Sequence, residues 1–205
     1  MKIVANNLGK RFNREWIFKK LSFTFEQGTT YAIVGPNGSG KSTLIQVLWG
    51  QVPQSTGTLY YQNDDKVIPQ EECYKHVSVA TPYMELIEEF TLEEMISFHF
   101  KFKKSVGELK GDEMIERMVL NHARDKQISK FSSGMKQRLK LGLALFSDVK
   151  AIFLDEPTTN LDKKSIEWYQ TNLRDLSKSR ITIIASNVDY EYPENAFKID
   201  LLDLK

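Results

Sequence analysis

A glycine-rich run near the start of the chain has the composition of a phosphate-binding loop. It reads Gly35, Pro36, Asn37, Gly38, Ser39, Gly40, Lys41, Ser42 and Thr43. This order satisfies the pattern G-x-x-x-x-G-K-[ST], in which glycines let consecutive backbone N–H groups wrap a polyphosphate. The lysine ammonium reaches the β and γ phosphates of a nucleotide, and the serine hydroxyl ligates Mg²⁺. We therefore expect all nine residues to bind a nucleotide, with Lys41 also taking part in catalysis.

Two adjacent carboxylates, Asp155 and Glu156, follow the apolar run Ala151–Leu154. Such a run predicts a buried strand, and open α/β sheets bind their ligands at the carboxyl ends of the strands. Asp155 is thus a candidate ligand of Mg²⁺, together with Ser42. Glu156 is a candidate for orienting the attacking water, because phosphoryl transfer needs little beyond positioning and charge neutralisation. The pair gains its significance from the phosphate-binding loop in the same chain.

A second cluster of small residues, Ser132, Ser133 and Gly134, precedes an expected helix. On one interpretation it is only a helix N-cap, and Lys136 and Arg138 are solvated charges. On the other it is a second anion site, because a helix N-terminus and two nearby cations favour negative charge. These residues alone leave both interpretations open.

Short apolar runs bounded by turn residues predict the strands of a sheet. They are Ile3–Ala5, Leu21–Phe25, Tyr31–Val34, Val77–Val79, Ala151–Leu154 and Ile181–Ala185. Helical patterns lie at Ser42–Trp49, Leu92–Phe102, Met135–Phe146 and Ser165–Leu176. The early strands are typical of antiparallel pairing, and the later alternation of strand and helix indicates a parallel layer covered by helices. We expect a single α/β domain, residues 1–205, with a helix-rich lobe at about 83–147.

Length, charge and cysteine content limit the class of protein. The chain has 205 residues, and 28 lysines and arginines stand against 27 aspartates and glutamates, for a net charge of +1. That balance argues against a nucleic-acid partner. No apolar stretch approaches the ~18 residues of a membrane-spanning helix, and the lone Cys73 cannot build a disulfide framework. These features predict a cytoplasmic protein.

The motifs, taken in this order, resemble the nucleotide-binding domain of the ATP-binding cassette (ABC) family over the span Leu8–Asn187. The run Phe131–Met135 is similar to the family signature Leu-Ser-Gly-Gly-Gln, and Pro157–Asp162 looks like the family's D-loop. Phe12 stands where the family stacks the adenine ring, a contact that needs only an aromatic face. The resemblance implies the P-loop NTPase fold of an ABC cassette, with a parallel core sheet, antiparallel N-terminal strands and an inserted helical subdomain.

The same resemblance implies how the chain works. In the family, two cassettes clamp two ATP molecules head to tail, so Ser132, Ser133 and Gly134 would face the γ-phosphate bound by the opposite protomer. Asp162 would lie at the dimer interface. Hydrolysis of ATP reopens the dimer and energises a separate transmembrane permease. The partner cassette is either a second copy or a sister chain, and the expected location is peripheral, on the inner face of the cell membrane.

Three elements depart from the family pattern. The stretch Ala80–Tyr83 lacks the glutamine that the family carries after this strand. Asn187 stands where the family has a histidine that touches the γ-phosphate. It can donate a hydrogen bond but carries no positive charge, and it remains a catalytic candidate. Ser133 and Met135 alter the signature. We expect slow ATP hydrolysis rather than none.

Two functions are consistent with this resemblance, and a third is less favoured. The leading hypothesis is the ATP-hydrolysing subunit of a membrane transporter. The alternative is a slow or inactive nucleotide-gated module that does not itself drive transport. Action on ribosomes or DNA is less favoured, because the chain has one cassette, no heptad run and little net charge. An acidic cluster is either a solvated helix face or a surface that docks the permease: Glu85, Glu88, Glu89, Glu93 and Glu94.

Overall fold

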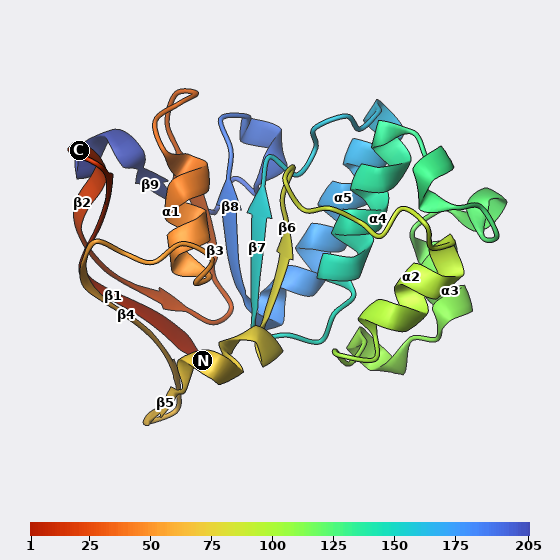
Figure 1. Ribbon diagram of the computed structural model, residues 1–205, viewed down its shortest axis with the longest axis horizontal. Helices are drawn as coiled ribbons and strands as arrows, with labels where there is room; N and C mark the ends of the chain where they lie inside the picture. Colours follow the sequence, from red (N-terminus) through yellow and green to blue (C-terminus); the bar gives the residue numbers. More distant parts are fainter.

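The computed structural model describes residues 1–205 and contains nine strands in two sheets. The strands are β1 (Lys2–Phe12), β2 (Glu15–Glu26), β3 (Thr30–Val34), β4 (Thr56–Asn63), β5 (Lys66–Ile68), β6 (Val77–Ala80), β7 (Ala151–Asp155), β8 (Ile181–Ala185) and β9 (Phe197–Asp200). One sheet is antiparallel, in the order β2-β1-β4-β5, and the other is parallel, in the order β6-β7-β8-β3-β9 (Figure 1). The expected α/β fold, with antiparallel N-terminal strands and a parallel core sheet, is confirmed.

Five α-helices accompany the sheets. They are α1 (Lys41–Leu48), α2 (Leu92–His99), α3 (Gly111–Arg117), α4 (Ser133–Leu145) and α5 (Lys163–Leu176). Side-chain caps set the start of three of them. The Ser132 hydroxyl accepts the Met135 N–H at 3.2 Å at α4, Thr91 and Glu94 form a capping box at α2, and Asp162 caps α5. None of the helices combines the length and the apolar character that crossing a bilayer requires.

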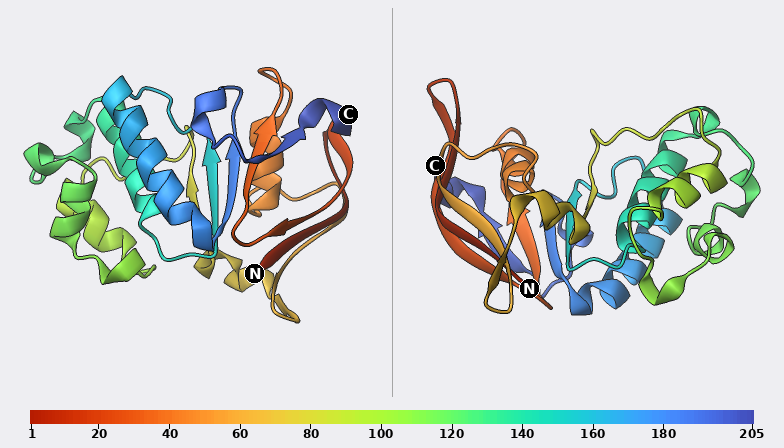
Figure 2. Two further views of the ribbon diagram at one scale, coloured as in Figure 1. Left: turned by 180° about the vertical axis from the view of Figure 1, so that it is seen from behind. Right: turned by 60° about the horizontal axis from the view of Figure 1, so that its bottom comes forward.

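Two hydrophobic cores lie on opposite faces of the parallel sheet. Alternate residues of β7 serve the two cores, because successive side chains of a strand point to opposite faces. Ile152 and Leu154 belong to the core shared with α2 to α5, and Phe153 belongs to the core shared with α1 and the antiparallel sheet. Figure 2 shows the sheet between these layers, with α5 in front when seen from behind. Buried on both faces, the sheet is a rigid frame for the loops at its carboxyl edge.

Several element boundaries differ from the sequence-based expectation. The helix expected at Leu92–Phe102 ends at His99, where the backbone leaves the helical region at Phe100. The expected strands Ile3–Ala5 and Leu21–Phe25 are the centres of the much longer β1 and β2, which pair with each other along their length. The sequence patterns missed three strands and one helix altogether: β4, β5, β9 and α3.

The acidic cluster is not one helix face. Glu85, Glu88 and Glu89 lie in the loop before α2, and only Glu93 and Glu94 fall in the first turn of that helix. The interpretation of the cluster as a solvated helix face is therefore wrong for its first three members.

Candidate functional site

The phosphate-binding loop connects β3 to α1 at the carboxyl edge of the parallel sheet (Figure 1). Its backbone passes through the left-handed region at Gly38, with φ of 76°, and at Gly40, with φ of 106°. Gly40 also has no room for a side chain, because a Cβ there would lie 2.2 Å from Cγ2 of Ile17 in β2. The glycines thus allow a tight loop whose amide groups lie at the start of a helix, the arrangement that favours phosphate.

Lys41 is folded back onto this loop. Its side chain is only 6% exposed, and its Nζ donates to the carbonyl oxygens of Gly35 at 2.8 Å and Pro36 at 3.1 Å. The ammonium group is therefore already at the loop, with the loop's own carbonyls as its partners. An arriving phosphate offers it a charged acceptor, and hydrogen bonds between charged groups are the stronger ones.

Asp155, at the end of β7, is 1% exposed, and its Oδ1 atom has no hydrogen-bond partner. Burial raises the pKa of this carboxyl to about 6, and the charges of Glu156 and Glu191 act in the same direction. The Ser42 hydroxyl and the Lys41 ammonium lower its pKa. A buried carboxylate oxygen without a partner, close to a hydroxyl, is a hard-oxygen donor set of the kind that Mg²⁺ prefers. The residues present therefore fit the ion that the sequence motif implies.

Glu156 turns the chain sharply away from β7. Its φ is 43°, in the left-handed region that few non-glycine residues adopt. Its N–H donates to the Ala185 carbonyl of β8 at 2.9 Å, which fixes the backbone, while its side chain is partly exposed. Strained backbone of this kind is common at functional sites. The structure thus holds one carboxylate buried and leaves its neighbour open to solvent at the same edge of the sheet.

Asn187 follows β8 and lies beside the phosphate-binding loop. Its Nδ2 donates to the side-chain oxygen of Asn37 at 3.0 Å. The fold thus brings Asn187, Asp155, Glu156 and the phosphate-binding loop to one edge of the sheet.

The candidate second anion site, at the start of α4, lies next to the loop after β7. Ser132, Ser133 and Gly134 start α4, which lies beyond β6, whereas the phosphate-binding loop follows β3 on the other side of the sheet (Figure 1). Ser132 and Ser133 are exposed. A Cβ at Gly134 would come within 2.9 Å of the Asn160 carbonyl, so the start of α4 packs closely on the loop after β7. Within one chain, no hydrogen bond joins Ser132, Ser133 or Gly134 to the phosphate-binding loop.

Phe12 and Asp162 belong to two other elements, the end of β1 and the N-cap of α5. Phe12 ends β1, is 48% exposed, and has the Lys10 ammonium 4.7 Å from its ring centroid. Much of its surface therefore remains open to another ring. Asp162 accepts the Ser165 hydroxyl and also the Ser165 N–H, the latter at 2.8 Å, and these two bonds lower the pKa of its carboxyl. Asp162 thus caps α5, and the Arg138 guanidinium of α4 lies 3.9 Å from its Oδ1.

Two further residues contact the loops that follow β6, β7 and β8, and neither was predicted from the sequence. Lys140, on α4, donates to the Pro82 carbonyl at 3.0 Å in the stretch where no glutamine is present. Glu191, on the short turn η6 (Asp189–Glu191), contributes a buried carboxylate. Neither residue belongs to a local motif, because each acts only through contacts distant in sequence.

Comparison with known proteins agrees with the resemblance to the ABC family that the sequence motifs indicate. The sequence model of the ABC transporter family matches residues 18–159. The chain is 30% identical to the uncharacterized ABC transporter ATP-binding protein YybJ of Bacillus subtilis, and the match covers 88% of this chain and 83% of YybJ. It is also 30% identical to the Nod factor export ATP-binding protein I of Burkholderia lata, over 87% of this chain and 60% of that protein.

A solved structure has the same fold along the whole chain. It is a putative ABC transporter ATP-binding protein of Pyrococcus furiosus, with a TM-score of 0.82 over 100% of this chain and 99% of that one, at 18% identity. The extent of the family match, the relatives and the geometry of the phosphate-binding loop agree. The chain belongs to the ABC transporter family, as an ATP-binding ATPase subunit of such a transporter.

Proposed function

We propose that this chain binds ATP with Mg²⁺ at the edge formed by the phosphate-binding loop, Asp155, Glu156 and Asn187. Two such cassettes would then close on ATP to energise a separate membrane permease. The observation that carries the nucleotide site is the unpartnered Oδ1 of Asp155 beside Ser42 and Lys41. A buried carboxylate without a partner is costly, and a divalent cation with its phosphate would satisfy it.

Each residue has a distinct task in this proposal. The backbone of Gly35–Thr43 wraps the phosphates, Lys41 transfers its hydrogen bonds from the loop carbonyls to the β and γ phosphates, and Phe12 stacks on the adenine. Asp155 and Ser42 would hold Mg²⁺, which supplies neutralisation of the phosphate charge. Glu156 accepts a hydrogen bond from the attacking water and orients it. Asn187 donates its amide hydrogen bond to the γ-phosphate in place of Asn37.

Dimerisation completes the site in the proposal. A cap on the γ-phosphate from the start of α4 would come from a second cassette, since α4 packs on β6, and the strands β7 and β8 separate β6 from β3, which leads into the phosphate-binding loop. The side chains of Ser132 and Ser133 are exposed, and Gly134 is partly exposed. All three residues are therefore available to a partner. The partner is a second copy or a sister cassette, and Asp162 lies in the same interface.

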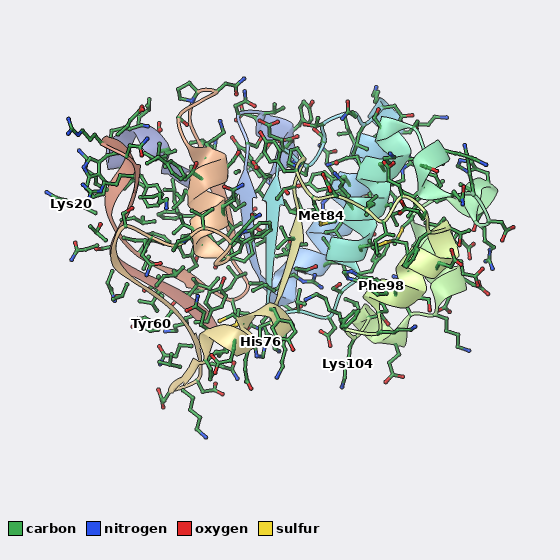
Figure 3. All side chains as sticks on the ribbon, in the orientation of Figure 1. Lys20, Tyr60, His76, Met84, Phe98 and Lys104 are labelled. Atoms are coloured by element: carbon green, nitrogen blue, oxygen red, sulfur yellow. The ribbon has the colours of Figure 1, made fainter.

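The helix-rich lobe offers the surface for the permease. The segment from β6 to this lobe carries Met84, and α2 carries Phe98, as Figure 3 shows. Phe98 lies 5.2 Å from Phe102 between ring centroids, and both rings are exposed. The acidic loop Glu85–Glu89 lies between these apolar groups in sequence. Apolar patches rimmed by charge are typical of protein-binding sites, so we place the permease here, at the inner face of the cell membrane. One relative is named for export.

Reversal of two acidic charges tests this surface. Replacing Glu88 and Glu89 together with lysine is expected to release the protein from membranes that contain the permease, while ATP binding stays unchanged. Glu88 pairs with Lys136, and both glutamates are exposed. Co-sedimentation with permease-containing membranes and a nucleotide titration measure the two properties.

The matched control carries the same change of charge away from this surface. Glu71 and Glu72 are exposed on the turn before β6, and their double lysine variant should sediment normally. Normal sedimentation of the Glu88 and Glu89 variant would remove this surface from the proposal, whereas release of both variants would indicate a general effect of charge.

One observation favours a second candidate function, the slow nucleotide-gated module. The amide of Asn187 cannot carry charge, and it is engaged with Asn37 rather than free to meet a phosphate. An uncharged donor stabilises the phosphate charge less than a cation would, which favours slow hydrolysis. Turnover measurements with a Glu156 variant separate the two candidates, as described in the Discussion.

A further inference from the structure

Glu191 is a buried acid with an unusual set of partners. Its side chain is 3% exposed and takes part in no ion pair. Oε1 accepts the Thr158 N–H at 2.9 Å and also the Thr158 hydroxyl, and Oε2 accepts the Ser186 hydroxyl. Three donors from two separate loops thus meet on one carboxylate. This number of donors satisfies a buried carboxyl group that would otherwise be costly.

The two loops that Glu191 joins are the loops that carry the proposed catalytic groups. Thr158 lies two residues after Glu156, and Ser186 directly precedes Asn187. The Ser186 N–H donates to the Ile33 carbonyl of β3 at 3.1 Å, and Asn187 reaches Asn37 of the phosphate-binding loop. Hydrogen bonds therefore run from Ile33 of β3 through Ser186 and Glu191 to the loop after β7, and the neighbouring Asn187 adds a bond to the phosphate-binding loop.

The fold does not need this carboxylate to dock η6. The Tyr169 hydroxyl donates to the backbone carbonyl of Glu191 at 2.7 Å, so the turn stays attached to α5 when the side chain changes. Gln137 independently holds the loop after β7, through a bond from its Nε2 to the Pro157 carbonyl at 2.8 Å. The charge of Glu191 also raises the pKa of Asp155, so it opposes the ionised form of its neighbour. The Glu191 carboxylate is therefore not the sole anchor of η6 or of the loop after β7, and anchoring alone does not explain why an acid is buried there.

We infer that Glu191 is a positioning residue for ATP hydrolysis: its carboxylate holds the Glu156 loop and the Asn187 loop in one fixed arrangement. This inference rests on the proposed roles of Glu156 and Asn187. Glu191 makes no hydrogen bond to the phosphate-binding loop or to its lysine. It acts on geometry, and small displacements of catalytic groups are costly, since a shift of about 1 Å can slow a reaction about a hundredfold.

The Glu191→Ala variant tests the inference. We expect kcat for ATP to fall by between about tenfold and a hundredfold, with KM within about twofold of the unmodified protein, because the phosphate contacts remain. In Glu191→Gln the amide oxygen can accept both the N–H and the hydroxyl of Thr158, and the Ser186 hydroxyl can accept from the amide NH2 instead of donating. This variant should recover kcat to within about threefold of the unmodified protein. Glu194→Ala, which removes an exposed acid three residues away, is the matched control and should leave both constants unchanged.

Two results would overturn the inference. One is a kcat of Glu191→Ala within twofold of the unmodified protein. The other is a rise of KM in step with the fall of kcat, which indicates general loosening of the nucleotide site. If Glu191→Ala does not fold, Thr158→Val removes one of the three donors and leaves the buried carboxylate in place. It should lower kcat at constant KM, and an unchanged kcat would count against the inference in the same way.

Parallel measurements on Glu156→Gln keep this inference separate from the proposed function. If Glu156→Gln is slow and Glu191→Ala is normal, only the role of Glu191 fails. If Glu156→Gln hydrolyses ATP at the normal rate, the assignment of the water-orienting group fails, and the inference about Glu191 fails with it.

Discussion

Replacement of Glu156 with glutamine is expected to lower ATP turnover at least a hundredfold and to leave ATP binding nearly unchanged. The amide has the same size but is a much weaker hydrogen-bond acceptor for water and no base, and loss of a positioned general base costs about 100-fold to 10,000-fold. The Glu156 backbone is held by its bond to Ala185, so the substitution should not move the loop. Single-turnover hydrolysis at saturating ATP measures the chemical step directly.

The control for this substitution is Glu167→Gln, an exposed acid on α5 that should hydrolyse ATP normally. A decrease confined to the Glu156 variant supports the transporter ATPase. The slow nucleotide-gated module predicts a different result, an already negligible rate in the unmodified protein that the Glu156 variant leaves unchanged. A fast unmodified rate that the Glu156 substitution does not reduce would contradict the role given to this carboxylate.

Replacement of Lys41 with alanine is expected to weaken ATP binding by about tenfold to a hundredfold. Hydrogen bonds from a charged group are worth about 1.5–3 kcal/mol, and each 1.4 kcal/mol is about a tenfold change in affinity. The Lys41 side chain is nearly buried at the loop, and the other ammonium group on this loop, that of Lys205, donates to the Ser39 carbonyl rather than to the carbonyls that Lys41 contacts. Titration with a fluorescent ATP analogue gives the dissociation constant.

The Lys41 variant also leaves the carbonyls of Gly35 and Pro36 without their donor, so its thermal unfolding should be measured beside its affinity. Lys20→Ala, at an exposed position on β2, controls for loss of one positive charge. A normal unfolding temperature with reduced affinity supports the phosphate contact. Equal affinity of the Lys41 variant and the unmodified protein would show that the ammonium does not bind the phosphates.

The phosphate-binding loop and the Asp155–Glu156 pair could be located from sequence because their signals are local. A loop that wraps phosphate needs glycines at set spacings, and a strand buried on both faces reads as a continuous apolar run. β7 and β8 therefore start at the expected residues, and β8 also ends where expected. The structure adds what spacing does not contain, such as the 3.0 Å bond that joins Asn187 to Asn37.

Strands that depend on pairing partners distant in the sequence were not predicted. β9 pairs with β3, more than 160 residues earlier, and its own pattern is mostly exposed. β4 pairs with one edge of β1, and β2 pairs with the other edge. Strand preference depends strongly on such neighbours, so short polar segments of this kind carry little signal of their own. The boundaries of the helix-rich lobe stay a prediction.

Glu191 and Lys140 escaped prediction for a related reason. Each side chain acts on a loop far away in the sequence, and neither has a neighbour whose spacing indicates its role. The same limit applies to Ser132, Ser133 and Gly134. The structure places them at the start of α4 and shows that Ser132 is the helix cap, one of the two interpretations open from sequence. Whether they also bind phosphate across a dimer stays a prediction.

Light scattering on the Glu156→Gln variant, with and without ATP, tests the central claim most directly, because this variant should retain bound ATP. We expect single copies without nucleotide and a dimer with ATP and Mg²⁺. Adding Ser132→Arg should fill the second anion site and leave single copies that still bind ATP, while Ser97→Arg, at an exposed position on α2, should not prevent the dimer. An ATP-induced dimer that survives Ser132→Arg would contradict the proposal that one cassette caps the phosphates held by another.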